Sequence, residues 1–388
     1  MRGVWLLSWR HLRHNRAQTL VLILCIAVPA FLPLATRLLV DRYEEELGAR
    51  ARQTPLIAGA RGNRFDLVMS GLYFRKASLD SIPWTQLLEI EASRLGTPIP
   101  VNVRHTARER PIVGTSVEYY ELRGIRPDLG TVPLQLGDVA LGAQVARDLG
   151  LGPGDHLFSD RKDLYDIAKP PALKMAVCGV LAETGTPDDD AVFVDIRTTW
   201  ILEGLVHGHD EAASVNKGLV LGEQGDRIHL SPALMQYNEV TSANAHTFHY
   251  HGPADALPLS AVIVAPRDRK SSTLLKARFN VSREWQMLVP QAVIEELMGF
   301  VFKVKAFLDV YWGVLALTTL LLIALVVVLS TRLRAREMLT LDRIGCSRST
   351  VVSLYAVELL FVGLLAGTLA GAGMLALHLM LPDLSKVL

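Results

Sequence analysis

Three stretches of the chain are apolar over a length that suits a membrane, and the residues between them are patterned in much shorter runs. Residues 19–40, 310–330 and 351–381 each contain at most one Asp, Glu, Lys or Arg. A helix that crosses a bilayer needs roughly 20 consecutive apolar residues, so the pattern predicts three transmembrane helices at these positions. Residues 41–309 contain no stretch of that kind, and we expect them to form one large folded region on one side of the membrane.

Short apolar runs bounded by Gly, Pro or charged residues predict strands within this region, and longer runs with helical periodicity predict helices. Residues 44–53 and 289–309 are expected to extend the neighbouring transmembrane helices as stalks. The predicted strands are residues 65–69, 99–103, 111–122, 174–181, 191–196 and 260–265, and the predicted helices are residues 143–149 and 268–278. The sequence therefore predicts an α+β membrane protein, with three transmembrane helices and a large mixed α/β extracytoplasmic domain between spans one and two.

Charge beside the apolar stretches predicts their orientation. Residues 1–18 contain four arginines and no acid, with apolar side chains between them, which is typical of a helix lying in the inner membrane interface. Residues 331–350 also carry more arginine than acid, whereas residues 44–46 are all glutamate. Because Arg and Lys concentrate in cytoplasmic loops, we expect the N-terminus and residues 331–350 to be cytoplasmic. Residues 41–309 and the tail 382–388 are then extracytoplasmic.

Composition excludes several classes of protein. The formal net charge of the 388 residues is +1, which gives no general attraction to nucleic acid. Of three cysteines only Cys178 falls in the extracytoplasmic region, so no intrachain disulfide framework is expected. The chain contains no G-x-x-x-x-G-K-[ST], H-E-x-x-H or G-x-S-x-G motif. We therefore expect no catalytic residues and no ATP bound by this chain itself.

A charged segment and the helix that follows it carry a family signature. The run from residue 336 to residue 371 joins a short charged stretch to an apolar one punctuated by glycine. It resembles the MacB/FtsX/LolC type of ABC-transporter permease, whose pattern is roughly R-E-x-x-x-L-x-x-x-G-x-S followed by a helix with Glu and spaced glycines. The matching residues are Arg336, Glu337, Leu341, Gly345, Ser347, Glu358, Gly363 and Gly367, and the departures are Asp342 and Cys346, where the family more often has Arg and Ala.

The resemblance implies a role and partners. In that family the charged stretch, within the cytoplasmic loop 331–350, is a coupling helix that docks on a separate ABC ATPase subunit. The coupling residues here would be Arg336, Glu337, Leu341, Gly345 and Ser347. The resemblance further implies a permease subunit of the bacterial inner membrane, working as a homo- or heterodimer, whose MacB-like periplasmic domain is moved by ATP hydrolysis on the partner. Residues 203–259 would be the variable subdomain of that domain. The family usually has a fourth span, and this sequence stops after the third, so the subgroup has lost the last helix, another chain supplies it, or the sequence is shortened.

Other interpretations stay open at this stage. A basic loop beside a membrane also suits binding to anionic lipid. The chain could be an FtsX-like regulator that transports nothing and activates a periplasmic hydrolase, or a membrane sensor that binds metal. A periplasmic adaptor or a metal-binding protein could be a further partner. The cargo is not identified by these residues, and both zinc-related transport and lipoprotein export fit.

The third span contains glycine at a regular spacing. Gly363, Gly367 and Gly371 recur every four residues, and small residues at that spacing let two membrane helices approach closely. We expect these glycines to pack against another membrane helix, either the first span or a helix of a second permease chain.

Histidine is concentrated in the predicted variable subdomain. His207 and His209 would point to one face of a strand, as would His249 and His251, and imidazole is a common ligand of Zn²⁺. These four are candidate zinc ligands, although a polar surface loop fits equally well. The H-G-H and H-x-H-G elements also resemble an FtsX-like permease subgroup associated with zinc-responsive transport. The acidic residues 188–190 could hold a cation, but a solvated turn between strands is the simpler interpretation.

Overall fold

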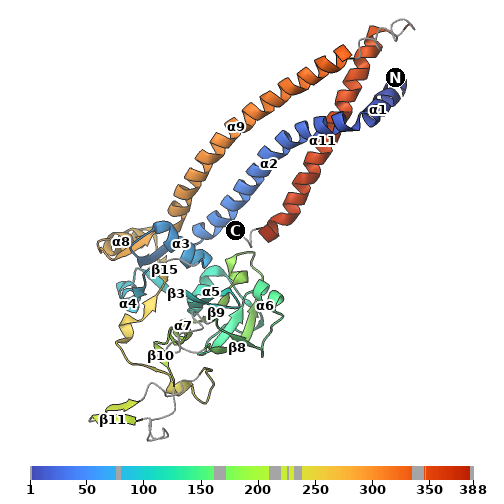
Figure 1. The fold of residues 1–388 in the computed structure, drawn as a ribbon. Helices are drawn as coiled ribbons and strands as arrows, with labels where there is room; N and C mark the ends of the chain where they lie inside the picture. The colour runs from blue at the N-terminus through green and yellow to red at the C-terminus, as the bar shows by residue number, and fades with distance from the viewer. Residues whose placement is uncertain are drawn as a thin grey trace. The chain divides into compact units, whose positions relative to one another are not determined.

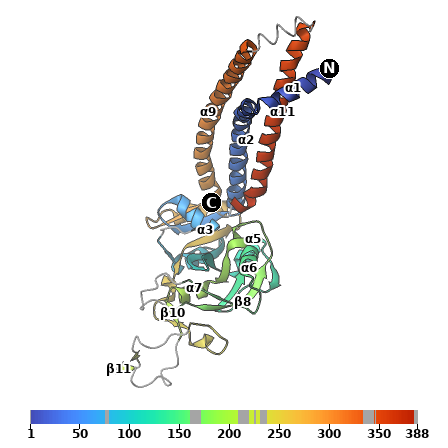
Figure 2. The ribbon, with the colours of Figure 1, turned by 45° about the vertical axis from the view of Figure 1, so that its right-hand side comes forward.

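The computed structural model describes residues 2–75, 80–160, 172–208, 220–224, 227–230, 238–333, 345 and 347–384. The chain divides into two compact units (Figure 1, Figure 2). The helical unit comprises Met1–Glu45 and Leu297–Leu388, and the sheet unit comprises Glu46–Glu296. Two long helices belong to both units, since each begins in one unit and ends in the other.

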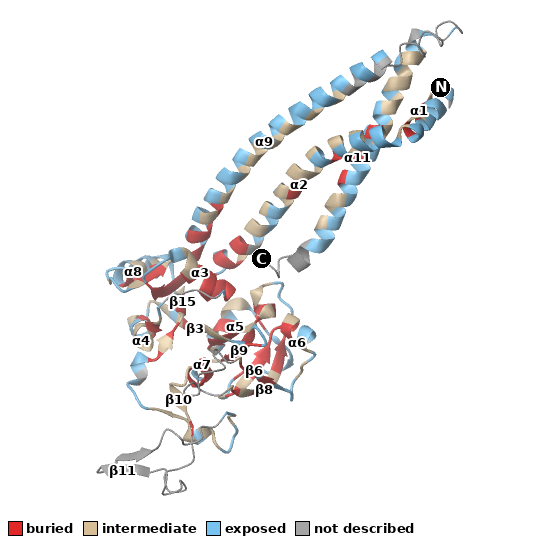
Figure 3. Cartoon of the chain, viewed as in Figure 1, coloured by how far each residue is buried: buried red, intermediate tan, exposed pale blue. Residues whose placement is uncertain are grey.

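Among the described residues, three helices have the length and apolar composition to cross a membrane. They are α2 (Arg16–Arg52), α9 (Pro290–Leu333) and α11 (Arg348–Leu384), and each contains one of the three apolar stretches. Many of their apolar residues are exposed, above all on α9, which Figure 3 colours mostly as exposed; there Phe307 is 73% exposed and Val310 is 69% exposed. So much contiguous apolar surface is unusual for a protein surrounded by water and suits a lipid environment.

The short amphipathic helix α1 (Arg2–His14) packs against α11. The hydroxyl of Ser8 donates a hydrogen bond to the carbonyl oxygen of Leu354 at 3.1 Å. The ring of Phe361 contacts two indoles, with centroid distances of 5.2 Å to Trp5 and 5.7 Å to Trp9. The residues predicted to form an interfacial helix are therefore helical and contact the third apolar helix.

A mixed β-sheet organises the sheet unit. Its strands lie in the order β16-β1-β15-β3-β4-β9-β6-β8-β5, and β7 also pairs with β8. Neighbours are antiparallel except for the parallel pairs β4–β9 and β6–β8. The strands are β1 (Leu56–Ala60), β3 (Gly96–Ala107), β4 (Arg110–Thr115), β5 (Pro127–Gly130), β6 (Asp138–Leu141), β7 (His156–Phe158), β8 (Lys174–Leu181), β9 (Val192–Asp195), β15 (Ala261–Pro266) and β16 (Trp285–Leu288). The helices of this unit are α3 (Arg64–Tyr73), α4 (Trp84–Ser93), α5 (Val117–Arg123), α6 (Ala143–Leu149), α7 (Ile196–Leu202) and α8 (Arg269–Phe279).

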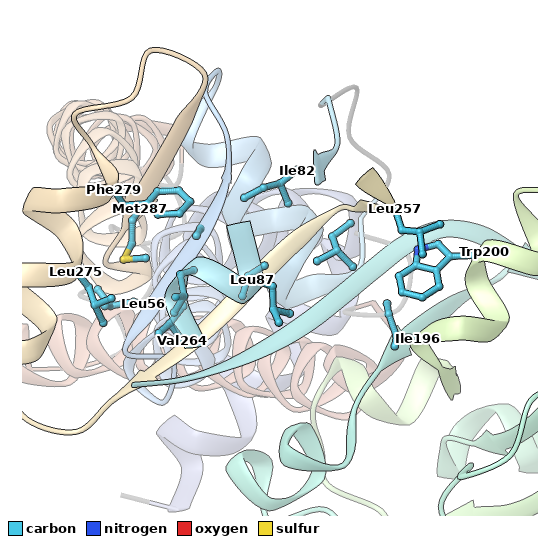
Figure 4. Packing of buried hydrophobic residues seen from close by; sticks show 14 residues of the cluster. Leu56, Ile82, Leu87, Ile196, Trp200, Leu257, Val264, Leu275, Phe279 and Met287 are labelled. Atoms are coloured by element: carbon cyan, nitrogen blue, oxygen red, sulfur yellow. The ribbon is translucent and has the colours of Figure 1, made fainter. Parts of the chain in front are cut away.

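The central strands are apolar on both faces because both faces are covered. Along β9, Val192 and Val194 belong to one buried apolar cluster, and Phe193 belongs to another. Successive side chains of a strand point to opposite faces, so these clusters lie on opposite sides of the sheet. A third cluster covers β1 and β15 with side chains from α4, α7 and α8 (Figure 4). In that cluster the indoles of Trp84 and Trp200 meet edge to face, with centroids 5.3 Å apart.

Two of the predicted strands are wrong in whole or in part. Residues 65–69 lie in α3, where the Asn63 side chain accepts a hydrogen bond from the backbone N–H of Phe65 at 3.0 Å and caps the helix. Every residue from Leu67 to Tyr73 is buried, and a fully buried run shows no periodicity that would separate helix from strand. Residues 111–122 split into β4 and α5. The other predicted strands and both predicted helices are present. The ends of β8 and α6 match, those of β9, β15 and α8 are shifted by one residue, and β3 is longer than predicted at both ends.

The predicted variable subdomain holds short strand pairs of its own. Strand β10 (Val206–His207) pairs with β13 (His249–Tyr250), and β11 (Val220–Gln224) pairs with β12 (Arg227–Leu230). Strand β14 (Pro258–Leu259) pairs with β2 (Ile82–Pro83), which returns the chain to the main sheet. The remaining short 3₁₀ turns are η1 (Pro187–Asp190), η3 (Ala245–Thr247) and η4 (Ala254–Ala256).

Candidate functional site

The predicted coupling residues are only partly described. Arg336, Glu337 and Leu341 lie outside the described residues. Gly345 has φ +89°, a left-handed conformation that glycine adopts without strain. Ser347 stands one residue before α11, and its hydroxyl accepts a hydrogen bond from the backbone N–H of Thr350 at 3.3 Å. This is the geometry of a helix N-cap. The G-x-S end of the motif therefore forms the turn and the cap that begin α11.

The predicted glycine stripe does not pack against the described part of this chain. A Cβ atom placed on Gly363, Gly367 or Gly371 would have no neighbour within 4 Å. The buried face of α11 is instead formed one position earlier in each turn, by Val362, Ala366 and Ala370. Packing of the glycine stripe against a helix of another chain stays a prediction.

The sheet unit contains a buried ion pair that joins the end of α2 to the turn η1. The guanidinium of Arg50 donates to both oxygens of the Asp188 carboxylate, with N–O distances of 2.9 Å and 2.5 Å. The hydroxyl of Tyr119 donates to the same carboxylate at 2.7 Å. Arg50 also donates to the carbonyl oxygen of Leu72 and lies over the ring of Phe74, 5.2 Å from its centroid. Arg50 is 4% exposed and Asp188 is 3% exposed.

Charge complementarity keeps this buried carboxylate ionised. Burial alone would raise the pKa of Asp188, but the adjacent Arg50 guanidinium outweighs this and holds the pKa below its ordinary value. The carboxylate accepts further hydrogen bonds from Tyr119 and from the hydroxyl of Thr186, at 2.7 Å and 2.9 Å. This buried pair holds the end of α2 against the turn η1, because separating the two side chains would leave an unpaired charge in the protein interior.

The acidic turn is thus neither a solvated turn nor an open cation site. Its second member, Asp189, accepts hydrogen bonds from the backbone N–H groups of Thr184 and Gly185, at 2.9 Å and 2.7 Å. Asp190 forms an ion pair with Arg110 at 2.8 Å. Sequence reasoning missed the role of Asp188 because Arg50 is 138 residues away, and no local pattern links the two.

Three of the four predicted zinc ligands come together in the structure. His207 in β10 stands directly opposite His249 in β13, and His251 follows two residues later. Among the described residues these three form a group whose ligand nitrogens all lie within 4.8 Å of one another. The Nε2 atoms of His249 and His251 are 3.1 Å apart. The fourth predicted ligand, His209, lies outside the described residues.

The opposite face of the same strand pair holds it to the core. Val206 pairs with Tyr250, and both pack against the cluster that contains Trp200. Phe248, two residues before Tyr250, packs against the neighbouring cluster. Because side chains alternate along a strand, His207 and His249 point away from these apolar contacts, and His251 follows directly after β13. The three imidazoles are therefore positioned by the packing of their neighbours.

Two glycines next to the histidines, Gly208 and Gly252, lie close to the aromatic rings of Phe248 and Tyr250. A Cβ atom on Gly208 would lie 2.7 Å from the ring of Phe248, and one on Gly252 would lie 2.5 Å from the hydroxyl of Tyr250. At Gly208 the ring of Phe248 would have to shift, whereas at Gly252 the contact is with the far end of the Tyr250 side chain, which can move. The glycine in H-G-H therefore supports the packing of Phe248 beside the histidines.

Comparisons with known proteins find similarity in structure only. No protein-family model matches the chain, and no curated protein matches it. The structure is similar to the periplasmic region of MacB from Actinobacillus actinomycetemcomitans, with 8% identity, a TM-score of 0.37, and coverage of 65% of this chain and 97% of that one. It is also similar to the extracellular domain of the noncanonic ABC-type transporter YknZ from Gram-positive bacteria, with 11% identity, a TM-score of 0.33, and coverage of 61% and 99%.

Proposed function

We propose that this chain is a permease subunit of an ABC-type transporter, in which a separate ATPase subunit drives movement of the sheet unit outside the cytoplasm. The observation that carries the proposal is the course of α2. This single helix contains an apolar stretch long enough to cross a membrane, and it ends in the buried Arg50–Asp188 pair. A displacement of the helix would therefore act directly on the turn that bears Asp188.

The second long helix supports the same mechanism. Helix α9 begins at Pro290 inside the sheet unit, where Val293 and Ile294 are buried, and continues through the apolar stretch 310–330. Arg64 on α3 forms an ion pair with Glu296 of α9 at 3.1 Å. Residues 331–350, which follow α9, contain the motif that resembles a coupling helix. ATP hydrolysis would act on that motif, and the two helices would carry its effect to the sheet unit.

Disrupting the motif tests this proposal. In Leu339→Pro the proline removes a backbone donor and clashes with the preceding turn, at a cost of about 3 kcal/mol to a helix. We expect this variant to reach the membrane but to lose both co-purification of the ATPase subunit and its regulation. Leu339→Ala, which preserves helical propensity, is the matched control and should keep both. An ATPase that binds Leu339→Pro and is regulated normally would show that residues 331–350 are not the coupling element.

Labelling with a thiol reagent that cannot cross membranes tests the topology. In a background with serine in place of all three cysteines, Val281→Cys offers a site in the sheet unit, because Val281 is 82% exposed. We expect this site to react in intact spheroplasts, and Thr340→Cys to react only after the membrane is opened. Labelling of Thr340→Cys before that step would refute a cytoplasmic location for residues 331–350.

A further inference from the structure

We propose that His207, His249 and His251 form a zinc-binding site in the sheet unit, a role that goes beyond the coupling proposed above. The nitrogens of two of them already have the spacing of zinc ligands. Zn–N bonds are 2.0–2.1 Å, so two nitrogens of a tetrahedral site lie about 3.3 Å apart. The Nε2 atoms of His249 and His251 are 3.1 Å apart. The nitrogens of all three lie within 4.8 Å, so a small rotation of the His207 side chain completes the set.

A backbone carbonyl favours one tautomer of the His249 ring. Its Nδ1 atom lies 2.7 Å from the carbonyl oxygen of Thr247. A carbonyl oxygen only accepts hydrogen bonds, so Nδ1 carries the proton and the lone pair of the neutral ring is on Nε2. Zinc-bound histidines usually donate their second ring nitrogen to a carbonyl or carboxylate in this way, which fixes the tautomer and the ring orientation. His249 therefore presents a ligand nitrogen toward His251.

The position of the three rings follows from the strand pairing. Residues directly opposite each other in an antiparallel pair have Cβ atoms about 5 Å apart, and the residue two positions further lies on the same face. His207 and His249 satisfy the first relation. His251 follows directly after the end of β13 and is brought to them by the turn there, with its Nε2 atom 3.1 Å from that of His249. Because Val206, Phe248 and Tyr250 hold the other face against the apolar clusters, much of the entropy of bringing the ligands together has been lost already in folding.

The ligand set predicts which ion binds. Imidazole nitrogen suits zinc and the late transition metals, whereas Ca²⁺ and Mg²⁺ prefer oxygen. Three neutral ligands leave the double charge of Zn²⁺ uncompensated and leave one tetrahedral position for water or an outside ligand. We therefore infer a site that exchanges zinc with its surroundings, rather than a closed structural site.

Zinc titration of the full chain in detergent, without any ATPase subunit, tests the proposal independently of the coupling mechanism. We expect one Zn²⁺ per chain with a dissociation constant well below about 100 μM, and no binding of Ca²⁺ in the same range. His251→Ala should weaken binding by roughly 10-fold or more, and His249→Ala with His251→Ala by on the order of 100-fold or more.

The matched control is His246→Ala, an exposed histidine three residues before His249 that lies outside the group of three. It should bind zinc as the unaltered chain does. Since His251 is exposed, its replacement leaves the fold intact, which keeps the test valid even if the double variant misfolds. Cobalt substitution adds a spectroscopic readout, because tetrahedral Co²⁺ absorbs strongly in the visible range. Binding weaker than about 100 μM, or equal binding by His251→Ala and the unaltered chain, would overturn the proposal.

Discussion

Asp188→Ala is expected to destabilise the sheet unit by about 3–5 kcal/mol, which is the cost of leaving one member of a buried ion pair without its partner. The cost is high here because Arg50 is almost fully buried and its guanidinium would lose both carboxylate oxygens. Tyr119 would lose its hydrogen-bond acceptor as well. Replacing both charges together, as in Arg50→Met with Asp188→Leu, should recover most of the loss, since no unpaired charge then remains.

Cys178 provides the measurement. Burial raises the pKa of its thiol to about 11, so the thiol reacts slowly in the folded sheet unit and much faster once the unit unfolds. With Cys25 and Cys346 replaced by serine, the rate of Cys178 modification in increasing urea reports the free energy of unfolding. Asp190→Ala is the matched control from the same turn. Its ion pair with Arg110 is about one-third exposed, so we expect a change of about 1 kcal/mol or less. Equal effects of the two substitutions would contradict the importance of the buried pair.

The same pair predicts how stability depends on acid. The folded pKa of Asp188 is lower than its ordinary value. The contribution of this carboxylate is therefore fully present above the ordinary Asp pKa of about 3.9 and is lost as the pH falls toward the lower folded value. Urea unfolding of the unaltered chain should become easier across this interval, and the double variant Arg50→Met with Asp188→Leu should show a smaller dependence.

Gly142→Ala is expected to destabilise the sheet unit by about 1–3 kcal/mol, the usual range for overpacking. Its backbone conformation, φ −61° and ψ 153°, is open to alanine. The added Cβ, however, would lie 2.3 Å from the carbonyl oxygen of Asp188 and 2.5 Å from that of Asp189. Backbone atoms cannot rotate away as a side chain can, so the turn η1 must shift and the contact between Asp188 and Arg50 must loosen.

Gly152→Ala is the control for this second prediction. A Cβ atom at Gly152 meets nothing within 4 Å, so the substitution should change the free energy of unfolding by about 0.5 kcal/mol or less. Both variants can be measured by the modification rate of Cys178. If Gly142→Ala behaves like Gly152→Ala, the close approach of η1 to Gly142 does not constrain the fold.

The sequence predicted correctly those helices and strands whose ends are marked by nearby residues. The helix at residues 143–149 matches α6, because Gly150 ends it in a left-handed conformation, with φ +63°. The strand at residues 174–181 matches β8, which lies in the sheet between β6 and β5. The strand predicted at residues 65–69 was wrong because residues Leu67–Tyr73 of α3 are all buried, so their sequence has no helical alternation of apolar and polar residues.

A candidate site could be predicted only where its residues lie close together in the sequence. The pair His249 and His251 was visible from spacing alone, since alternate residues of a strand share a face. That His207 would stand opposite His249 depends on the pairing of β10 with β13, which no local pattern specifies. The Arg50–Asp188 pair depends entirely on tertiary structure. Its sequence signal, a charge at the end of a long helix and another in an acidic turn, is indistinguishable from ordinary surface charge.

The edge-to-face contact of Trp84 with Trp200 gives the sheet unit an optical reporter of its own. Trp200 lies in α7, six residues before β10 begins at Val206, and its indole N–H donates to the carbonyl oxygen of Pro258 at 2.9 Å. Two indoles at 5.3 Å couple their electronic transitions. A shift of α7, whether transmitted from the membrane helices or caused by zinc at His207, would alter that coupling. Circular dichroism in the aromatic bands can then follow such a movement without any attached dye.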